Sequence, residues 1–165
     1  MSYALEDTSG EAMAPVKGES AGAPPAIGAP KPYRITRSGA RPLRFAGSEL
    51  VMAMSFTPEL PYWYEINMYR TSDLEFVAAV RLFHQSEDMP DTVESMKFPS
   101  LEQALEMIEH YDAGCDVKFG MASELASQSA PELAAQALEL HARIGATRRH
   151  YRGLVGEILT ELDAA

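Results

Sequence analysis

The sequence predicts an α+β fold: a three- to four-stranded antiparallel meander covered by a helix, followed by a long C-terminal helix or helical hairpin. Three segments alternate apolar and polar residues, as half-buried strands do, and they span Glu49–Phe56, Trp63–Arg70 and Glu75–His84. The polar stretch Thr71–Asp73 is expected to form the turn between the second and third of these. A weaker fourth strand is expected at Thr92–Phe98.

The alternation divides the predicted sheet into two faces, and a helix is expected to cover one of them. The residues expected on that covered face are Leu50, Met52, Met54, Phe56, Tyr64, Ile66, Met68, Phe76, Ala78, Val80 and Leu82. The opposite face would then carry Val51, Ala53, Ser55, Trp63, Glu65, Asn67, Tyr69, Val77, Ala79, Arg81 and Phe83.

The covering helix is predicted over residues 100–112. Ser100 followed by Gln103 is a capping box, in which each side chain satisfies a free backbone N–H of the first turn. Apolar residues recur along one side of this segment and glutamates along the other. The apolar stripe is therefore expected to pack on the sheet.

A second helix is predicted to begin near Ala130. Ser129 and Glu132 form another capping box, and an apolar seam continues from there to Leu162 with spacings of three, four or seven residues. Glycine disfavours a helix by up to about 1 kcal/mol relative to alanine, so a break near Gly145 would turn this segment into a helical hairpin.

Composition divides the chain into three parts. Residues 1–32 are rich in Ala, Gly, Pro, Ser and Glu and are expected to form a disordered tail, because they cannot bury enough apolar surface to offset the entropy lost on ordering. Residues 33–120 would form the sheet-and-helix domain, and residues 121–165 a C-terminal amphipathic helical segment.

Charge and composition narrow the classes of function. The net charge is −10, from 24 acidic and 14 basic side chains, which argues against nucleic acid as a partner. The single cysteine excludes an internal disulfide. The sequence has no apolar run of membrane-spanning length and no secretory signal pattern, so a cytoplasmic location without membrane contact is expected.

The charges are unevenly distributed along the chain. Residues 31–57 carry five bases and one acid, whereas residues 58–125 carry four bases and fourteen acids. One interpretation is that the basic arm folds against the acidic domain. The other is that the arm reaches an anionic partner.

The sheet face opposite the predicted helix is the first candidate binding surface. Its candidate residues are Trp63, Glu65, Tyr69, Arg81 and Phe83. It is too apolar to be fully solvated and too polar to be a plain core. Three interpretations are open: the C-terminal helix covers it while Glu65 pairs with Arg81 across neighbouring strands, a partner protein or second copy docks on it, or it lines a small-molecule pocket.

The C-terminal helix supplies the second candidate surface. Arg148 and Arg152 share one side of it and could meet an anion or an acidic protein surface, or pair with a nearby acid such as Glu157. Leu154 and Ile158 belong to the apolar seam, which is longer than the predicted sheet needs for cover. These side chains are therefore predicted to contact a partner or a second copy.

Catalytic and metal-binding patterns are weak throughout. The four histidines are scattered. Glu106 and His110 are four residues apart on one helix face, a spacing that can bind a metal, but no further ligand set accompanies them. Cys115 lies between two aspartates, which disfavour a thiolate. No catalytic residue, metal site or cofactor is expected.

These observations favour a non-enzymatic protein-interaction module, such as an adaptor, an accessory subunit or an immunity-type inhibitor. Its partner would be another protein or a second copy of the chain. The alternative is a small-molecule-binding protein or minor enzyme with a pocket between the sheet and the C-terminal helix, lined by Trp63, Tyr69, Arg81 and Phe83.

Overall fold

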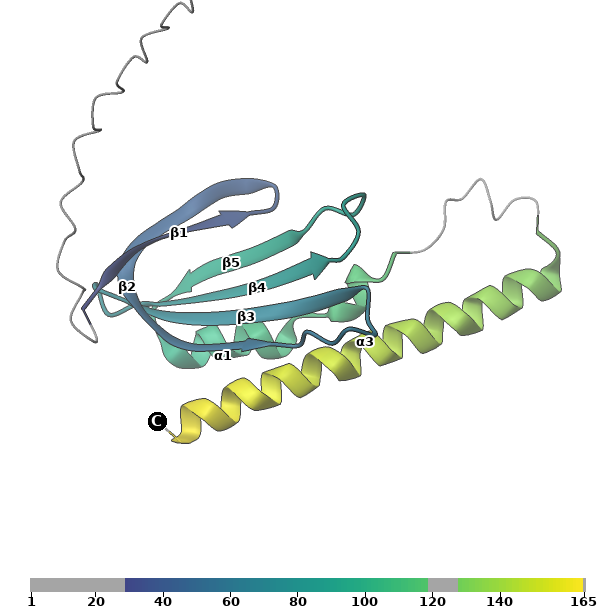
Figure 1. The fold of residues 1–165 in the computed structure, drawn as a ribbon. Helices are drawn as coiled ribbons and strands as arrows, with labels where there is room; N and C mark the ends of the chain where they lie inside the picture. The colour runs from purple at the N-terminus through teal and green to yellow at the C-terminus, as the bar shows by residue number, and fades with distance from the viewer. Residues whose placement is uncertain (1–28, 119–127, 165) are drawn as a thin grey trace, which may run out of the picture.

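A computed structural model describes residues 29–118 and 128–164. Within these residues the chain forms one antiparallel sheet in the order β1-β2-β3-β4-β5 (Figure 1). The elements are β1 (Lys31–Arg37), β2 (Ala40–Met54), β3 (Tyr62–Thr71), β4 (Phe76–His84), β5 (Thr92–Phe98), α1 (Leu101–His110), the 3-10 helix η1 (Ala113–Asp116) and α3 (Ala130–Ala164). The predicted α+β class is confirmed. Residues 1–28 of the predicted disordered tail lie outside the described residues, whereas its last two residues, Lys31 and Pro32, belong to β1.

The described sheet has five strands rather than three or four. The expected strand at Thr92–Phe98 is β5, and the strands missed in the sequence are β1 and the first half of β2. Both lie in the basic arm, where arginines and prolines separate a few apolar residues. Only one face of these two strands is buried, and it packs against side chains of β3 and β4, which are distant in the sequence. The residues of β1 and early β2 therefore show only a weak apolar alternation of their own.

Strand β2 bends and belongs to two parts of the sheet. β1 pairs with it from Ala40 to Gly47, and β3 pairs with it from Gly47 to Met54. Gly47 lies so close to β3 that an added Cβ would be 2.9 Å from the Cα of Thr71 and closer still to the carbonyl oxygen of Arg70. Glycine is therefore required at the bend.

A β-bulge between Glu49 and Val51 reverses the faces of β2. Before the bulge Glu49 is paired with Tyr69, and after it Val51 is paired with Met68, which lies on the other side of the sheet. The faces predicted for the residues of β2 are therefore wrong. Val51 and Ala53 are buried under the helices, whereas four residues expected there are exposed: Leu50, Met52, Met54 and Phe56.

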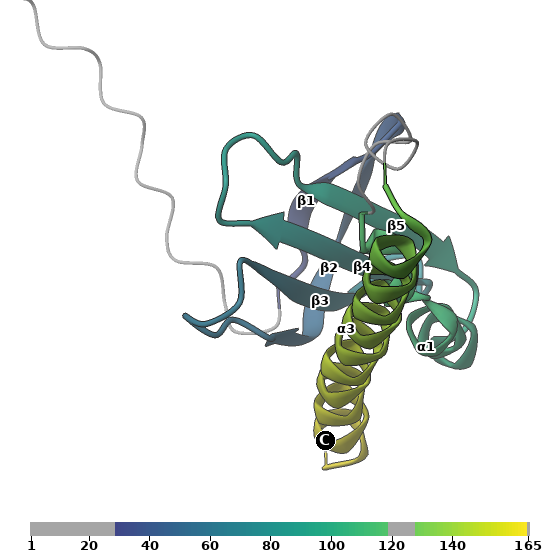
Figure 2. The same ribbon diagram turned by 90° about the vertical axis from the view of Figure 1, so that its right-hand side faces the viewer.

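Both helices cover the same face of the sheet (Figure 2). The main core lies between them and the strands, and its largest buried side chains are Tyr64, Tyr151, Ile66, Met68, Ile108, Ile158 and Val80. Both predicted helix starts are confirmed: the Ser100 hydroxyl accepts from the Gln103 N–H at 3.3 Å, and the Glu132 carboxylate accepts from the Ser129 N–H at 2.7 Å.

Helix α3 is continuous through Gly145, so the break considered for this segment does not occur. Its first turns extend beyond the sheet, and its second half packs against it (Figure 1). Leu154 is 2% exposed and Ile158 is 0% exposed. The prediction that these two side chains contact a partner therefore needs correction, because they fill the core of their own chain.

The opposite face of the sheet is partly closed by the β1–β2 hairpin. Tyr33, Leu43 and Phe45 pack over a second cluster built from Ile35, Tyr69, Val77 and Ala79. The rings of Tyr33 and Tyr69 lie 4.7 Å apart, and those of Phe45 and Tyr69 lie 5.3 Å apart. At its tip the hairpin reaches β5, where the Ser38 N–H donates to the Val93 carbonyl at 2.9 Å. The sheet is thus curled into a partly closed barrel.

Substituting Ile158 with glutamate is expected to unfold the chain rather than only to disrupt an assembly. An unpaired carboxylate in this core should cost about 4 kcal/mol or more, a large part of the roughly 5–15 kcal/mol by which domains are stable. Circular dichroism during urea unfolding measures this loss. Leu138→Glu is the matched control, because Leu138 is 73% exposed on the same helix. A folded Ile158→Glu protein with unchanged stability would contradict the packing described here.

Candidate functional site

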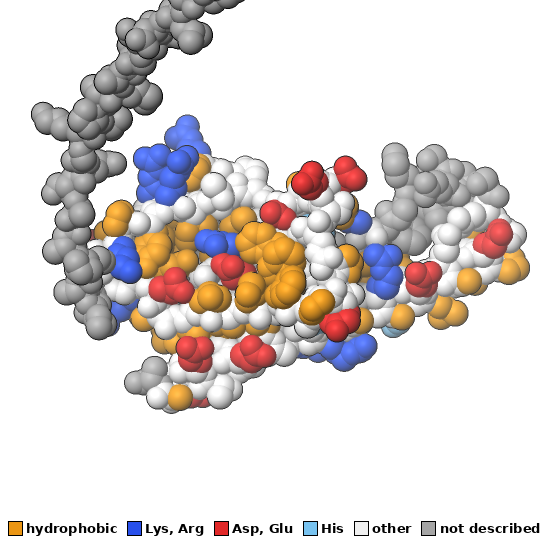
Figure 3. Space-filling model, viewed as in Figure 1, with side chains coloured by type: hydrophobic (Ala, Val, Ile, Leu, Met, Phe, Trp, Pro, Cys, Tyr) orange, Lys and Arg blue, Asp and Glu red, His pale blue; other side chains and the backbone are white. Residues whose placement is uncertain are grey.

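A group of large apolar side chains, some exposed and some half-buried, lies on the sheet face that the helices do not cover; we call it the aromatic face (Figure 3). The rings of Trp63 and Phe83 stack with centroids 5.3 Å apart, and Phe56 meets Trp63 edge-on at the same distance. Beside them Met54 is 51% exposed and Met52 is 47% exposed. Two of these five residues, Trp63 and Phe83, were predicted as binding candidates. The other three were expected under the helix, because the β2 bulge that places them on this face has no signal in the sequence.

An ion pair crosses the aromatic face between β3 and β4. The Arg81 Nη1 atom donates to Glu65 Oε1 at 2.8 Å, which confirms the expected pairing of these neighbours. Tyr69 lies further along β3 and is buried under the β1–β2 hairpin, so it is not part of the exposed surface. The C-terminal helix does not cover this face, because α3 packs on the other side of the sheet.

Acidic side chains gather at the end of the sheet that carries the aromatic face. Tyr62 pairs with His84 there, so the β2–β3 and β4–β5 connections lie at the same end. Their exposed acidic residues are Glu59, Glu87, Asp88 and Asp91. An apolar surface beside this acidic rim favours partners that combine apolar and basic side chains.

The two arginines of α3 that were predicted as binding candidates, Arg148 and Arg152, differ in their contacts. Arg148 donates to both carboxylate oxygens of Asp112 at 2.7 Å and so connects α3 to the start of η1. Asp112 also accepts from the Gly114 N–H at 2.9 Å. Its pKa is held well below the usual range, first by Arg148 and then by this N–H. Arg148 is therefore occupied by Asp112 rather than Glu157, whereas Arg152 is exposed.

A cavity of about 440 Å³ lies between the sheet and α3, where the alternative hypothesis expected a pocket. The residues expected to line it are on the other face of the sheet, so that part of the prediction is wrong. Its actual lining is Leu60, Pro61, Tyr62, Tyr64, Leu82, His84, Ser86, Met89, Asp116, Val117, Lys118, Arg143, Ala146 and Thr147. Nothing in the sequence relates these distant segments to one another.

Asp116 connects this cavity to a network of buried tyrosines. Its Oδ2 atom accepts hydrogen bonds from the hydroxyls of Tyr64 at 2.7 Å and Tyr111 at 2.8 Å. Burial, and then the neighbouring Asp116 carboxylate, raise the pKa of both phenols well above the usual range. Both groups therefore remain protonated donors at neutral pH, which suits a structural role better than proton transfer.

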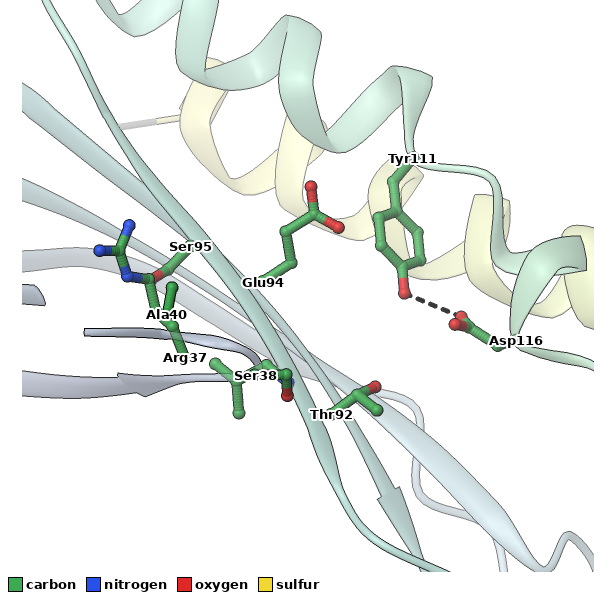
Figure 4. Close-up of a pocket in the computed structure, with 9 residues that line it drawn as sticks. Arg37, Ser38, Ala40, Thr92, Glu94, Ser95, Tyr111 and Asp116 are labelled. Carbon is green, nitrogen blue, oxygen red and sulfur yellow. Dashed lines mark hydrogen bonds between the residues drawn. The ribbon is translucent and has the colours of Figure 1, made fainter. Parts of the chain in front are cut away.

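A second hollow, of about 340 Å³, lies where the β1–β2 turn meets β5 (Figure 4). Arg37 and Ser38 lie on one side of β5, while Tyr111 and Asp116 lie on the other, with Glu94 pointing toward them. In the described part of the chain, no three His, Cys, Asp or Glu side chains converge as metal ligands would. Cys115 is exposed in η1.

The basic arm folds onto the sheet mainly through apolar contacts. None of its five bases forms an ion pair with any residue in the ranges 29–118 and 128–164. Arg37 instead donates to the backbone carbonyl of Arg41 at 2.8 Å. Attraction between the arm and the acidic domain is thus not what holds the hairpin in place.

Comparison of the chain with protein-family models, curated proteins and solved structures found no match. The function must therefore be inferred from the surfaces and cavities described above. No helix in the described ranges is both long enough and apolar enough to cross a lipid bilayer.

Four of the seven tyrosines, Tyr64, Tyr69, Tyr111 and Tyr151, are expected to ionise above the usual pH range. Burial is the main cause for each, and it raises the pKa of Tyr69 to about 12. Because folding favours the neutral phenols, their contribution to stability is complete below about pH 10 and is lost as the pH rises further. Absorbance titration of tyrosinate, with urea unfolding at each pH, measures both effects. Ionisation of all tyrosines near pH 10 in the folded protein would contradict this expectation.

Proposed function

We propose that this protein is a non-enzymatic interaction module that binds a partner protein through the aromatic face. One observation carries the proposal: three large apolar side chains, Met52, Met54 and Phe56, are exposed beside the half-buried Trp63 and Phe83, although apolar cores are packed on both sides of the sheet. Such patches commonly mark protein–protein contacts. An adaptor, an accessory subunit and an inhibitor of another protein all use surfaces of this kind.

The composition of the aromatic face fits a binding surface. Tryptophan and other aromatic residues dominate the energetics of many interfaces, since they bury a large area while few rotatable bonds are fixed. Methionine adapts to different partner shapes. The Glu65–Arg81 pair already satisfies its own charges, so a partner could cover it without leaving either charge unpaired.

The acidic rim indicates the chemistry of the partner. Four carboxylates at this end of the sheet would attract a segment with apolar anchors and flanking lysines or arginines. They would repel an identical rim on a second copy, so a different protein fits better than a symmetric dimer through this face. The C-terminal helix offers its exposed first turns to a partner, but not Leu154 or Ile158.

Trp63→Ala is expected to weaken partner binding by about tenfold or more, as truncation of a central interface tryptophan does. The full chain would be used to capture its partner from the native host, and the affinity of each variant for that purified partner would then be measured. Leu138→Ala is the control, because it removes an exposed large apolar side chain far from the aromatic face. Circular dichroism verifies that both variants remain folded.

Trp63 also provides a direct readout, because it is the only tryptophan in the chain. Partner binding at the aromatic face should shift its fluorescence to shorter wavelength and protect it from acrylamide quenching. Equal affinity of the Trp63→Ala and Leu138→Ala variants, or unchanged tryptophan fluorescence on binding, would overturn the proposal.

A further inference from the structure

We infer that the cavity between the sheet and α3 is a binding site for a small amphipathic carboxylic acid, with an apolar body and one anionic end. This inference is independent of docking on the aromatic face, because the cavity lies on the other side of the sheet. Its volume of about 440 Å³ is within the range of ligand pockets in proteins.

The walls of the cavity are held in place without any ligand. Gln85 fixes the β2–β3 connection, donating from its backbone N–H to Pro61 and from its side chain to Leu60, each at 2.9 Å. The Tyr62 hydroxyl and the Thr147 hydroxyl lie 3.0 Å apart and hold α3 at a fixed distance from β3. The cavity is thus preformed, which lowers the entropic cost of filling it.

The Tyr64–Asp116 hydrogen bond fixes the third wall, formed by the end of η1. Most of the lining is apolar, with Leu60, Leu82, Met89 and Val117 contributed by four different segments. Helix α3 contributes Ala146 to the lining, and the small side chain of this residue leaves the cavity open on that side. This lining suits a hydrocarbon or aromatic body rather than a sugar or a nucleotide.

The polar groups of the cavity favour an anion. Arg143 and Lys118 both line it, and neither forms an ion pair with another residue in the described ranges. His84 also lines it, and its buried Nδ1 atom has no hydrogen-bond partner among the described residues. A carboxylate could accept hydrogen bonds from the Arg143 and Lys118 side chains.

The negative groups nearby do not oppose this assignment. Among the described residues of the lining, Asp116 is the one acidic side chain, and its Oδ2 atom already accepts hydrogen bonds from two tyrosine hydroxyls. Glu87 and Asp88 belong to the adjacent loop but do not line the cavity. Lysine and arginine therefore outnumber free acids at the site.

Decanoate, below its micelle-forming concentration, is a suitable probe, and decanol is its uncharged counterpart. Titration of the full-length protein, followed by amide NMR, gives both the affinity and the location of binding. We expect decanoate to bind at one site at least about tenfold more tightly than decanol, and to shift the amide signals of Leu82, Val117 and Thr147. The Trp63 indole signal should remain unchanged, because it reports on the other face.

Three variants test the assignment. Arg143→Gln should weaken decanoate binding by at least about tenfold and leave decanol binding unchanged. Arg149→Gln, an exposed arginine on the same helix outside the cavity, should bind decanoate like the wild type. Ala146→Phe should block both probes by filling the space, with its melting temperature measured to verify folding.

Several results would overturn the inference. These are no saturable decanoate binding, equal affinity for decanoate and decanol, an Arg143→Gln variant that binds as well as Arg149→Gln, or shifts at the Trp63 indole in place of those at the cavity.

Discussion

The bend of β2 at Gly47 is the constraint on which the rest of the structure depends. β1 pairs with the strand before this point and β3 pairs with it after, so one continuous strand serves both layers of the molecule. The bend is possible because Gly47 has no side chain, so the backbone of β3 can occupy the space that a Cβ atom would fill. The bulge two residues later then directs Val51 and Ala53 toward the helices.

The bend explains why one surface stays open. The folded-back hairpin covers Tyr69, Val77 and Ala79, but the row that contains Trp63 and Phe83 lies beyond it. Both helices are committed to the other face, where Tyr151, Leu154 and Ile158 complete the main core. The aromatic face is therefore left uncovered by the topology, and the cavity arises where α3 continues past the ends of β3 and β4.

The sequence predicts local elements well and their spatial relations poorly. Capping residues locate α1 and α3, and alternation locates β3 and β4, because these signals lie within a few neighbouring residues. Alternation also shows which β2 residues share a face, but both of its faces are apolar, so the register with β3 decides which of them is buried. The Tyr64–Asp116 bond joins residues 52 positions apart and has no local signal. The candidate residues on β3 and β4 could be assigned to one face of the sheet from the two-residue period of a strand. Whether Leu154 is buried or exposed depends instead on which face of the sheet α3 packs against, and the sequence does not show this.

The free energy of unfolding of the Gly47→Ala variant tests the role of the bend most directly. Urea unfolding followed by circular dichroism should show a loss of about 2 kcal/mol or more, since the added methyl group must push β2 away from β3. Gly153→Ala is the matched control, because nothing lies within 4 Å of the added group on α3, and it should gain up to about 1 kcal/mol. A Gly47→Ala protein as stable as the wild type would show that the two layers do not depend on this close approach.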